Sequence, residues 1–220
     1  MNRVELKMDA KEKLKDKWAE SIKIILLLFV ISFGIGMVIG IPLGIIGIFN
    51  ENNEGIKNLT NLTSDVIAFV IGGIFTFGFT SFFLKISRNE EVTSNELFSK
   101  VNMFFKYITL VIFVGVIVAI GFIFLIIPGI ILSLAFSQTM YIMLDNPEIS
   151  TIDAMKESYN MMNGHKLDYF VLQLSFIGWA ILMVFTLGIG YFWLMPYMSV
   201  TECNFYNKIK EEYKSKNLSN

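Results

Sequence analysis

The stretch FLIIPGIILS, residues 124–133, decides the fold because it places a proline and a glycine inside a long apolar run. That run extends from Tyr107 to Leu144 without a charged residue. One helix of this length would measure about 57 Å, whereas the hydrocarbon core of a bilayer is about 30 Å thick. Proline interrupts helical hydrogen bonding but suits a first helical turn, and glycine permits a tight turn. We therefore predict two spans joined at Pro128-Gly129, with a kinked or re-entrant helix as the alternative.

The composition indicates a protein that lies mostly in lipid. Of 220 residues, 54% are hydrophobic and 17% are charged, whereas soluble domains average about 45–50% apolar and about 25% charged residues. The net charge of −1 gives no reason to expect nucleic acid as a partner. Cys203 is the single cysteine and His165 the single histidine, so we expect no intrachain disulfide and no Cys/His metal site.

Four apolar regions carry the membrane prediction: Ile22–Phe49, Val66–Ile86, Tyr107–Leu144 and Leu167–Tyr206. The first two have the length of one span each, and the last two are about twice too long. The last region divides at LGIG, residues 187–190, with Pro196 starting or kinking the final helix. We predict an all-α, polytopic membrane protein with six transmembrane helices that form three hairpins.

The placement of basic residues supports this count and sets the orientation. Lysine and arginine collect on the cytoplasmic side of membrane proteins. With six spans and both termini inside, all 18 Lys and Arg residues except Lys57 are cytoplasmic. The predicted organisation is a cytoplasmic amphipathic segment (1–21), a six-helix transmembrane domain (22–207) and a cytoplasmic tail (208–220). Lys57 belongs to the polar segment 50–65, which we expect to be an outer loop.

An amphipathic cytoplasmic segment precedes each predicted hairpin. Thr93 with Glu96 resembles a capping box, and Ser150 with Asp153 can cap the third segment. These segments either lie in the headgroup layer or pack under the helix bundle, and the sequence does not decide between the two. The apolar residues at helical spacing are Ala10, Leu14, Trp18 and Ile22, then Leu97, Val101, Phe104 and Phe105, then Ile152, Met155, Tyr159 and Met162.

The candidate intramembrane site consists of Gln138, Gln173 and Glu202, because ionisable and amide side chains within spans are rare and often functional. Glu202 can bind a cation or proton, or it is an interfacial carboxylate near the inner leaflet. Gln138 and Gln173 either hydrogen-bond across helices as structural contacts or line a polar pocket. The sequence does not separate these alternatives.

A second candidate site is the segment NMMNGHK, residues 160–166, at a cytoplasmic helix end. Asn163 or Gly164 can take the left-handed cap conformation. His165 and Lys166 are candidates for contact with a lipid headgroup phosphate, and the alternatives for His165 are a pH sensor or a packing residue next to the cap. No phosphate-binding loop, metalloprotease motif or nucleophile elbow is present, so the sequence predicts no catalytic residue, no cofactor and no enzyme.

The C-terminal half resembles a bacterial membrane family known as domain of unknown function 975. The resembling elements are Gly164-His165-Lys166, LSFIGW at 174–179, GIG at 188–190, Trp193 and Pro196-Tyr197, with the opening AKEKLKDKW and the IIPGI turn also similar. The resemblance implies a multi-pass protein of the cytoplasmic membrane, mostly in Gram-positive bacteria. It brings no established activity, so it assigns no catalytic residue.

Two functional hypotheses follow from the sequence. The first is a non-enzymatic scaffold or envelope-associated bundle, with the lipid bilayer and a membrane protein or a second copy of the chain as partners. The second is a small transporter, with Gln138, Gln173 and Glu202 along a polar path. The transport hypothesis requires these three side chains to meet at one water-accessible cavity.

Overall fold

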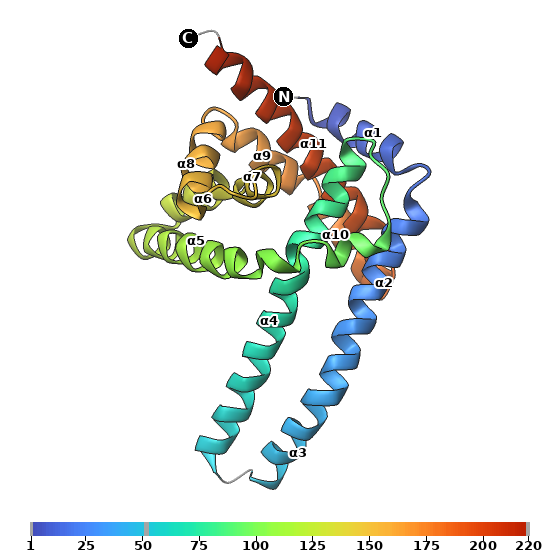
Figure 1. Cartoon of the computed structure of the whole chain (residues 1–220), viewed down its shortest axis with the longest axis vertical. Coiled ribbons are helices and arrows are strands. Elements are labelled where there is room, and N and C mark those ends of the chain that lie inside the picture. Colours follow the sequence, from blue (N-terminus) through green and yellow to red (C-terminus); the bar gives the residue numbers. More distant parts are fainter. Residues whose placement is uncertain (1, 51–52, 219–220) are drawn as a thin grey trace.

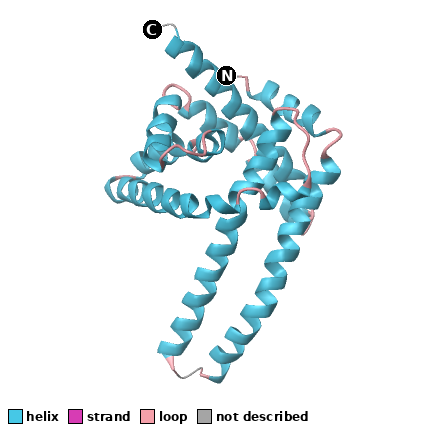
Figure 2. Cartoon of the chain, in the orientation of Figure 1, coloured by secondary structure: helices cyan, strands magenta, loops and turns pink. Residues whose placement is uncertain are grey.

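The computed structural model describes residues 2–50 and 53–218, and all regular structure in these ranges is helical, as predicted (Figures 1 and 2). The elements are α1 (Arg3–Leu14), α2 (Trp18–Ile35), the π-helical turn η1 (Gly36–Gly40), α3 (Ile41–Phe49), α4 (Glu54–Ser87), the 3₁₀ turns η2 (Ser94–Phe98) and η3 (Val101–Met103), α5 (Phe104–Phe124), α6 (Ile126–Phe136), α7 (Thr139–Asp145), α8 (Thr151–Met161), α9 (Lys166–Leu174), α10 (Ile177–Phe185) and α11 (Tyr191–Leu218).

The first hairpin projects from the rest of the molecule (Figure 1). One arm is the continuous helical segment α2–η1–α3, and the other arm is α4. The prediction of an outer loop over residues 50–65 is wrong from residue 54 onward, because α4 begins at Glu54. Asn53 caps this helix by accepting a hydrogen bond from the Ile56 amide at 3.2 Å. Residues 51 and 52 of the predicted loop lie outside the described residues.

The second hairpin consists of α5 and α6, which pack extensively against each other. Its break lies at Leu125, which is extended at φ −164° and ψ 150°, and Pro128 occupies the first turn of α6. A Cβ atom on Gly121 would lie 3.0 Å from the Cα of Gly129, so the two glycines permit close contact between the helices. The predicted helix break is confirmed, but it precedes the Pro-Gly pair by three residues.

The third hairpin runs through α9 and α10 and returns along α11. The chain reverses at Leu187 and Gly188, with φ of 51° and 86°, as the LGIG segment predicted. Pro196 lies inside α11 and does not start it.

Five helical segments within residues 2–50 and 53–218 are long and apolar enough to cross a membrane: Trp18–Phe49, Glu54–Ser87, Ser94–Phe124, Ile126–Asp145 and Lys166–Phe185. The first part of α11, predicted as a sixth span, is not among them because polar side chains lower its hydropathy. Figure 1 shows α5 running crosswise to α4, so the first two hairpins are not parallel in this structure. The arrangement of six spans as three hairpins therefore stays a prediction.

The N-terminal amphipathic helix α1 packs against α11, where Leu6, Ala10 and Leu14 are buried. The ammonium group of Lys7 donates a hydrogen bond to the carbonyl oxygen of Ser175 at 3.1 Å. Burial, together with the nearby Arg3 and Lys11, lowers the pKa of Lys7 below its usual value. For the first segment, the structure thus favours packing on the helices over lying free in a headgroup layer.

The second amphipathic segment differs from its predicted form, whereas the third is helical and has its predicted cap. Residues 94–103 form short 3₁₀ turns, and the side chain of Thr93 makes no capping hydrogen bond. Ser150 does cap α8, accepting a hydrogen bond from the Asp153 amide at 3.1 Å. Of its apolar stripe, Met155 and Met162 are buried, whereas Ile152 and Tyr159 are 49% and 48% exposed.

Candidate functional site

The carboxylate of Glu202 lies where α7, α9 and α11 meet. The side-chain amide of Gln173 donates to Glu202 Oε1 at 2.8 Å. The hydroxyl of Tyr141 donates to Glu202 Oε2 at 3.5 Å. Two uncharged donors therefore hold the carboxylate, and the predicted proximity of Gln173 and Glu202 is a direct hydrogen bond.

Gln138 is fully buried next to this pair. Its backbone amide donates to Ser158 Oγ at 3.2 Å, and its side-chain nitrogen donates to Ser137 Oγ at 2.8 Å. Among the hydrogen bonds of the described residues, Gln138 does not form the direct pair with Gln173 that the sequence left open. Its Oε1 atom has no hydrogen-bond partner among the described residues.

A cleft of about 610 Å³ lies between the first hairpin and helices α7 and α11. Glu202 and Cys203 form part of its otherwise mainly apolar wall. Gln138 and Gln173 do not line this cleft. The condition set for a transport path, in which the three side chains open together onto one cavity, is not met.

A second polar cluster at the charged end of the molecule centres on Asp145, the last residue of α7. The guanidinium of Arg88 donates two hydrogen bonds to the Asp145 carboxylate, at 2.7 and 2.9 Å. The hydroxyl of Tyr206 donates to Asp145 Oδ2 at 2.7 Å, and the ammonium of Lys210 forms an ion pair with the same carboxylate. Asp145 therefore joins the end of α4, the end of α7 and two turns of α11. We call Arg88, Asp145, Tyr206 and Lys210 the Asp145 cluster.

The Asp145 cluster and the Glu202 site are connected by two aromatic rings. Tyr141, which donates to Glu202, stacks on Tyr206 with ring centroids 5.1 Å apart. The sequence analysis did not identify the Asp145 cluster. A signal was present, because Asp145 directly follows an apolar run and is the first acidic residue after Glu96.

The two candidates for headgroup contact are already engaged by protein groups. His165 Nε2 lies 3.4 Å from a carboxylate oxygen of Glu212, and its Nδ1 lies 3.7 Å from Asp168. The ammonium of Lys166 lies 5.0 Å from the centre of the Tyr159 ring. Gly164, at φ +87°, supplies the left-handed cap before them. Because acidic groups face His165, this environment disfavours a phosphate, and the headgroup contact stays a prediction.

Comparison with protein families identifies the chain. The model of the family described as protein of unknown function (DUF975) matches residues 1–122 and 106–213. The chain belongs to this family. The resemblance inferred from the sequence is confirmed, and the DUF975 description assigns no activity that would give a role to Glu202 or Asp145. No curated protein and no solved structure matches this DUF975 chain.

Proposed function

We propose that this DUF975 protein is a multi-pass protein of the bacterial cell membrane with a non-enzymatic scaffold role. We call the charged end of the molecule, which contains the Asp145 cluster, the cytoplasmic cap. In this proposal, the cytoplasmic cap holds the membrane hairpins together and contacts a membrane protein partner or a second copy of the chain. The observation that carries the proposal is the Asp145 cluster, which ties α4, α7 and α11 together at one end.

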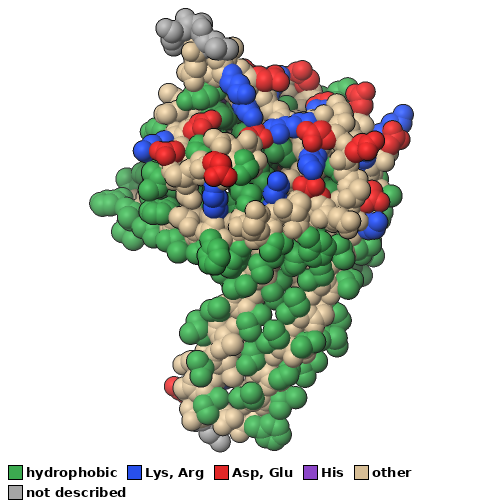
Figure 3. All heavy atoms as spheres, in the orientation of Figure 1, with side chains coloured by type: hydrophobic (Ala, Val, Ile, Leu, Met, Phe, Trp, Pro, Cys, Tyr) green, Lys and Arg blue, Asp and Glu red, His purple; other side chains and the backbone are tan. Residues whose placement is uncertain are grey.

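The distribution of side chains supports the orientation. Figure 3 shows acidic and basic groups gathered at the end where both termini lie, and hydrophobic groups over the projecting hairpin. Large apolar side chains on the first hairpin are exposed, including Phe29 at 62% and Val38 at 75%. Lipid is the environment that such a surface favours. The positive-inside rule then assigns the charged end, with the N- and C-termini, to the cytoplasm.

This topology does not depend on how deeply the second and third hairpins enter the lipid. Each hairpin leaves the charged end and returns to it, as the Asp145 cluster and the contact of α1 with α11 require. An even number of crossings follows for each hairpin that spans the bilayer. Six crossings are our preferred count, with the α5–α6 pair reoriented in the bilayer relative to Figure 1.

Cysteine labelling tests the topology. In a Cys203→Ser background, a membrane-impermeant maleimide applied to intact cells is expected to label Lys57→Cys but not Lys156→Cys. Both native lysines are exposed in the folded chain. A difference in labelling between the two variants would therefore not come from burial of either side chain. Lys156→Cys should become reactive after the membrane is permeabilised. Labelling of Lys156→Cys in intact cells would contradict a cytoplasmic cap.

Crosslinking tests the scaffold role. A scaffold is expected to give a discrete crosslinked partner or oligomer when intact cells are treated before purification. Asp145→Ala should lose this product because the cap opens, whereas Lys156→Gln, which removes an exposed ion pair of 3.2 Å, should retain it. Recovery of a monomer alone from wild-type cells would count against the scaffold role.

A further inference from the structure

A continuous groove runs along the first hairpin, between the α2–η1–α3 arm and α4. Three clefts of about 370, 270 and 610 Å³ follow one another along the two arms. Gly40, Leu43 and Ser64 line both the first and the second cleft, and Ser32 and Gly72 line both the second and the third. We call this space the hairpin groove.

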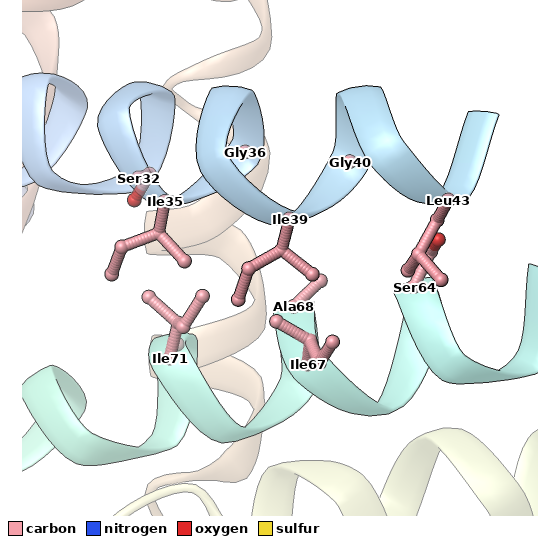
Figure 4. A pocket seen from close by; sticks show the side chains of 11 residues that line it. Ser32, Ile35, Gly36, Ile39, Gly40, Leu43, Ser64, Ile67, Ala68 and Ile71 are labelled. Atoms are coloured by element: carbon pink, nitrogen blue, oxygen red, sulfur yellow. The ribbon is translucent and has the colours of Figure 1, made fainter. Parts of the chain in front are cut away.

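The walls of the middle and inner clefts of the hairpin groove are suited to an alkyl chain, whereas Lys57, Thr60 and Asn61 make the outer cleft more polar. Figure 4 shows Ile35 and Ile39 on one arm directed across the space toward Ile67, Ala68 and Ile71 on the other. None of the described residues that line the middle cleft is charged. Glycines keep the wall open, since a Cβ atom added to Gly36, Gly40 or Gly72 would meet nothing within 4 Å.

Glu202 places a carboxyl group at the inner end of the groove, without a cationic partner among the described residues. Its two partners, Gln173 and Tyr141, are uncharged. No lysine, arginine or histidine of the described residues forms an ion pair with it. A carboxylate in apolar surroundings is costly unless a cation pairs with it. A primary ammonium supplies both the charge and three N–H donors.

We propose that the hairpin groove binds a long-chain primary amine, with the ammonium group on Glu202 and the alkyl chain between the two arms. An aminophospholipid fits this site less well, because no lysine or arginine in the described part of the chain lines the cleft around Glu202 to bind a phosphate. This site goes beyond the scaffold role, which rests on the Asp145 cluster. A failure of either proposal leaves the other standing.

Photolabelling of the full chain in phosphatidylcholine nanodiscs tests the site. The probe is hexadecylamine with a diazirine in its chain, and the comparison probe is the matching hexadecanol. The amine is expected to label peptides of residues 18–49 and 54–87, and excess unlabelled hexadecylamine should prevent this labelling. The alcohol should label the same peptides about tenfold less, because a hydrogen bond to a charged group is worth about a factor of ten or more.

Two variants and a matched control separate the effect of the Glu202 carboxylate from the effect of free volume in the hairpin groove. Glu202→Gln keeps one acceptor oxygen, for one of the two donors Gln173 and Tyr141, but should lower amine labelling about tenfold, to the level of the alcohol. Gly72→Leu should fill the groove and lower labelling by both probes. Gly115→Leu is the control, because Gly115 also has open space around its Cβ position but lies on α5, outside the groove.

Several results would overturn the assignment. Equal labelling of the wild-type chain by amine and alcohol would show apolar contact without recognition of the ammonium. Labelling of α5 and α6 as strong as that of the hairpin would show general contact with lipid. If phosphatidylethanolamine competed as strongly as hexadecylamine, the inference that the site around Glu202 does not accept a phosphate group would be wrong. Loss of a dimer in Gly72→Leu, without any amine-dependent labelling, would assign the groove to a second copy of the chain.

Discussion

Replacing Asp145 by alanine is expected to destabilise the folded protein by about 3 kcal/mol, because breaking a buried ion pair leaves its partners uncompensated. The Asp145 side chain is 15% exposed, and the side chains of Arg88 and Lys210 are 30% and 24% exposed. Without the carboxylate, two cationic groups face each other, and the Tyr206 hydroxyl loses its acceptor. The measurement is the free energy of unfolding in mixed micelles of a mild detergent and sodium dodecyl sulfate.

The control for this substitution is Lys156→Gln, which also removes an ion pair. Lys156 and Asp153 are 70% and 61% exposed, and their atoms lie 3.2 Å apart. Exposed pairs contribute little to stability, so this variant should unfold almost like the wild type. A double variant, Asp145→Leu with Arg88→Met, should recover part of the lost stability because apolar replacement removes the unpaired guanidinium. A free energy for Asp145→Ala within about 1 kcal/mol of wild type would contradict the bridging role of this residue.

The sequence predicted the helices and their breaks well because both depend on short-range chemistry. Helix length, proline and glycine placement and the cap at Ser150 are local properties. The left-handed residues Gly164 and Gly188 both occur where the sequence analysis placed a helix cap or a turn. The failures were also local in origin. Asn53 starts a helix within a segment that is polar enough to be a loop, and its capping hydrogen bond decides the outcome.

The relative placement of the helices could not be predicted, because side chains far apart in the sequence determine it. The second amphipathic segment illustrates this limit. Glu96 was expected to cap its own helix, but it accepts hydrogen bonds from Ser81 and Lys85, at 2.8 and 2.7 Å. Gln138 and Gln173 were identified as rare polar groups, but only the fold shows that Gln173 donates to Glu202 and Gln138 to Ser137. Arg88 and Asp145 lie 57 residues apart in the sequence, and their pairing is a tertiary contact.

A second large effect is expected at Gly78, where the 3₁₀ turn η2 packs directly on α4. A Cβ atom at this position would lie 2.1 Å from the backbone oxygen of Leu97 and 2.9 Å from that of Glu96. Backbone atoms cannot move aside as a flexible side chain does, so Gly78→Ala must displace the turn. Leu97 is fully buried, and its displacement adds a loss of apolar burial to the steric cost. We expect a destabilisation of about 3 kcal/mol in the same micellar unfolding measurement.

The matched control lies on the same helix. Gly72→Ala introduces the same methyl group where nothing lies within 4 Å. Alanine is a better helix former than glycine, so this variant should be stabilised by up to about 1 kcal/mol. The two substitutions are chemically identical and should have opposite signs, which separates the steric contact from any general effect of alanine in α4. If Gly78→Ala also stabilised the protein, η2 would not pack on α4 at this distance, and the position of Glu96 beside Lys85 would have to be abandoned.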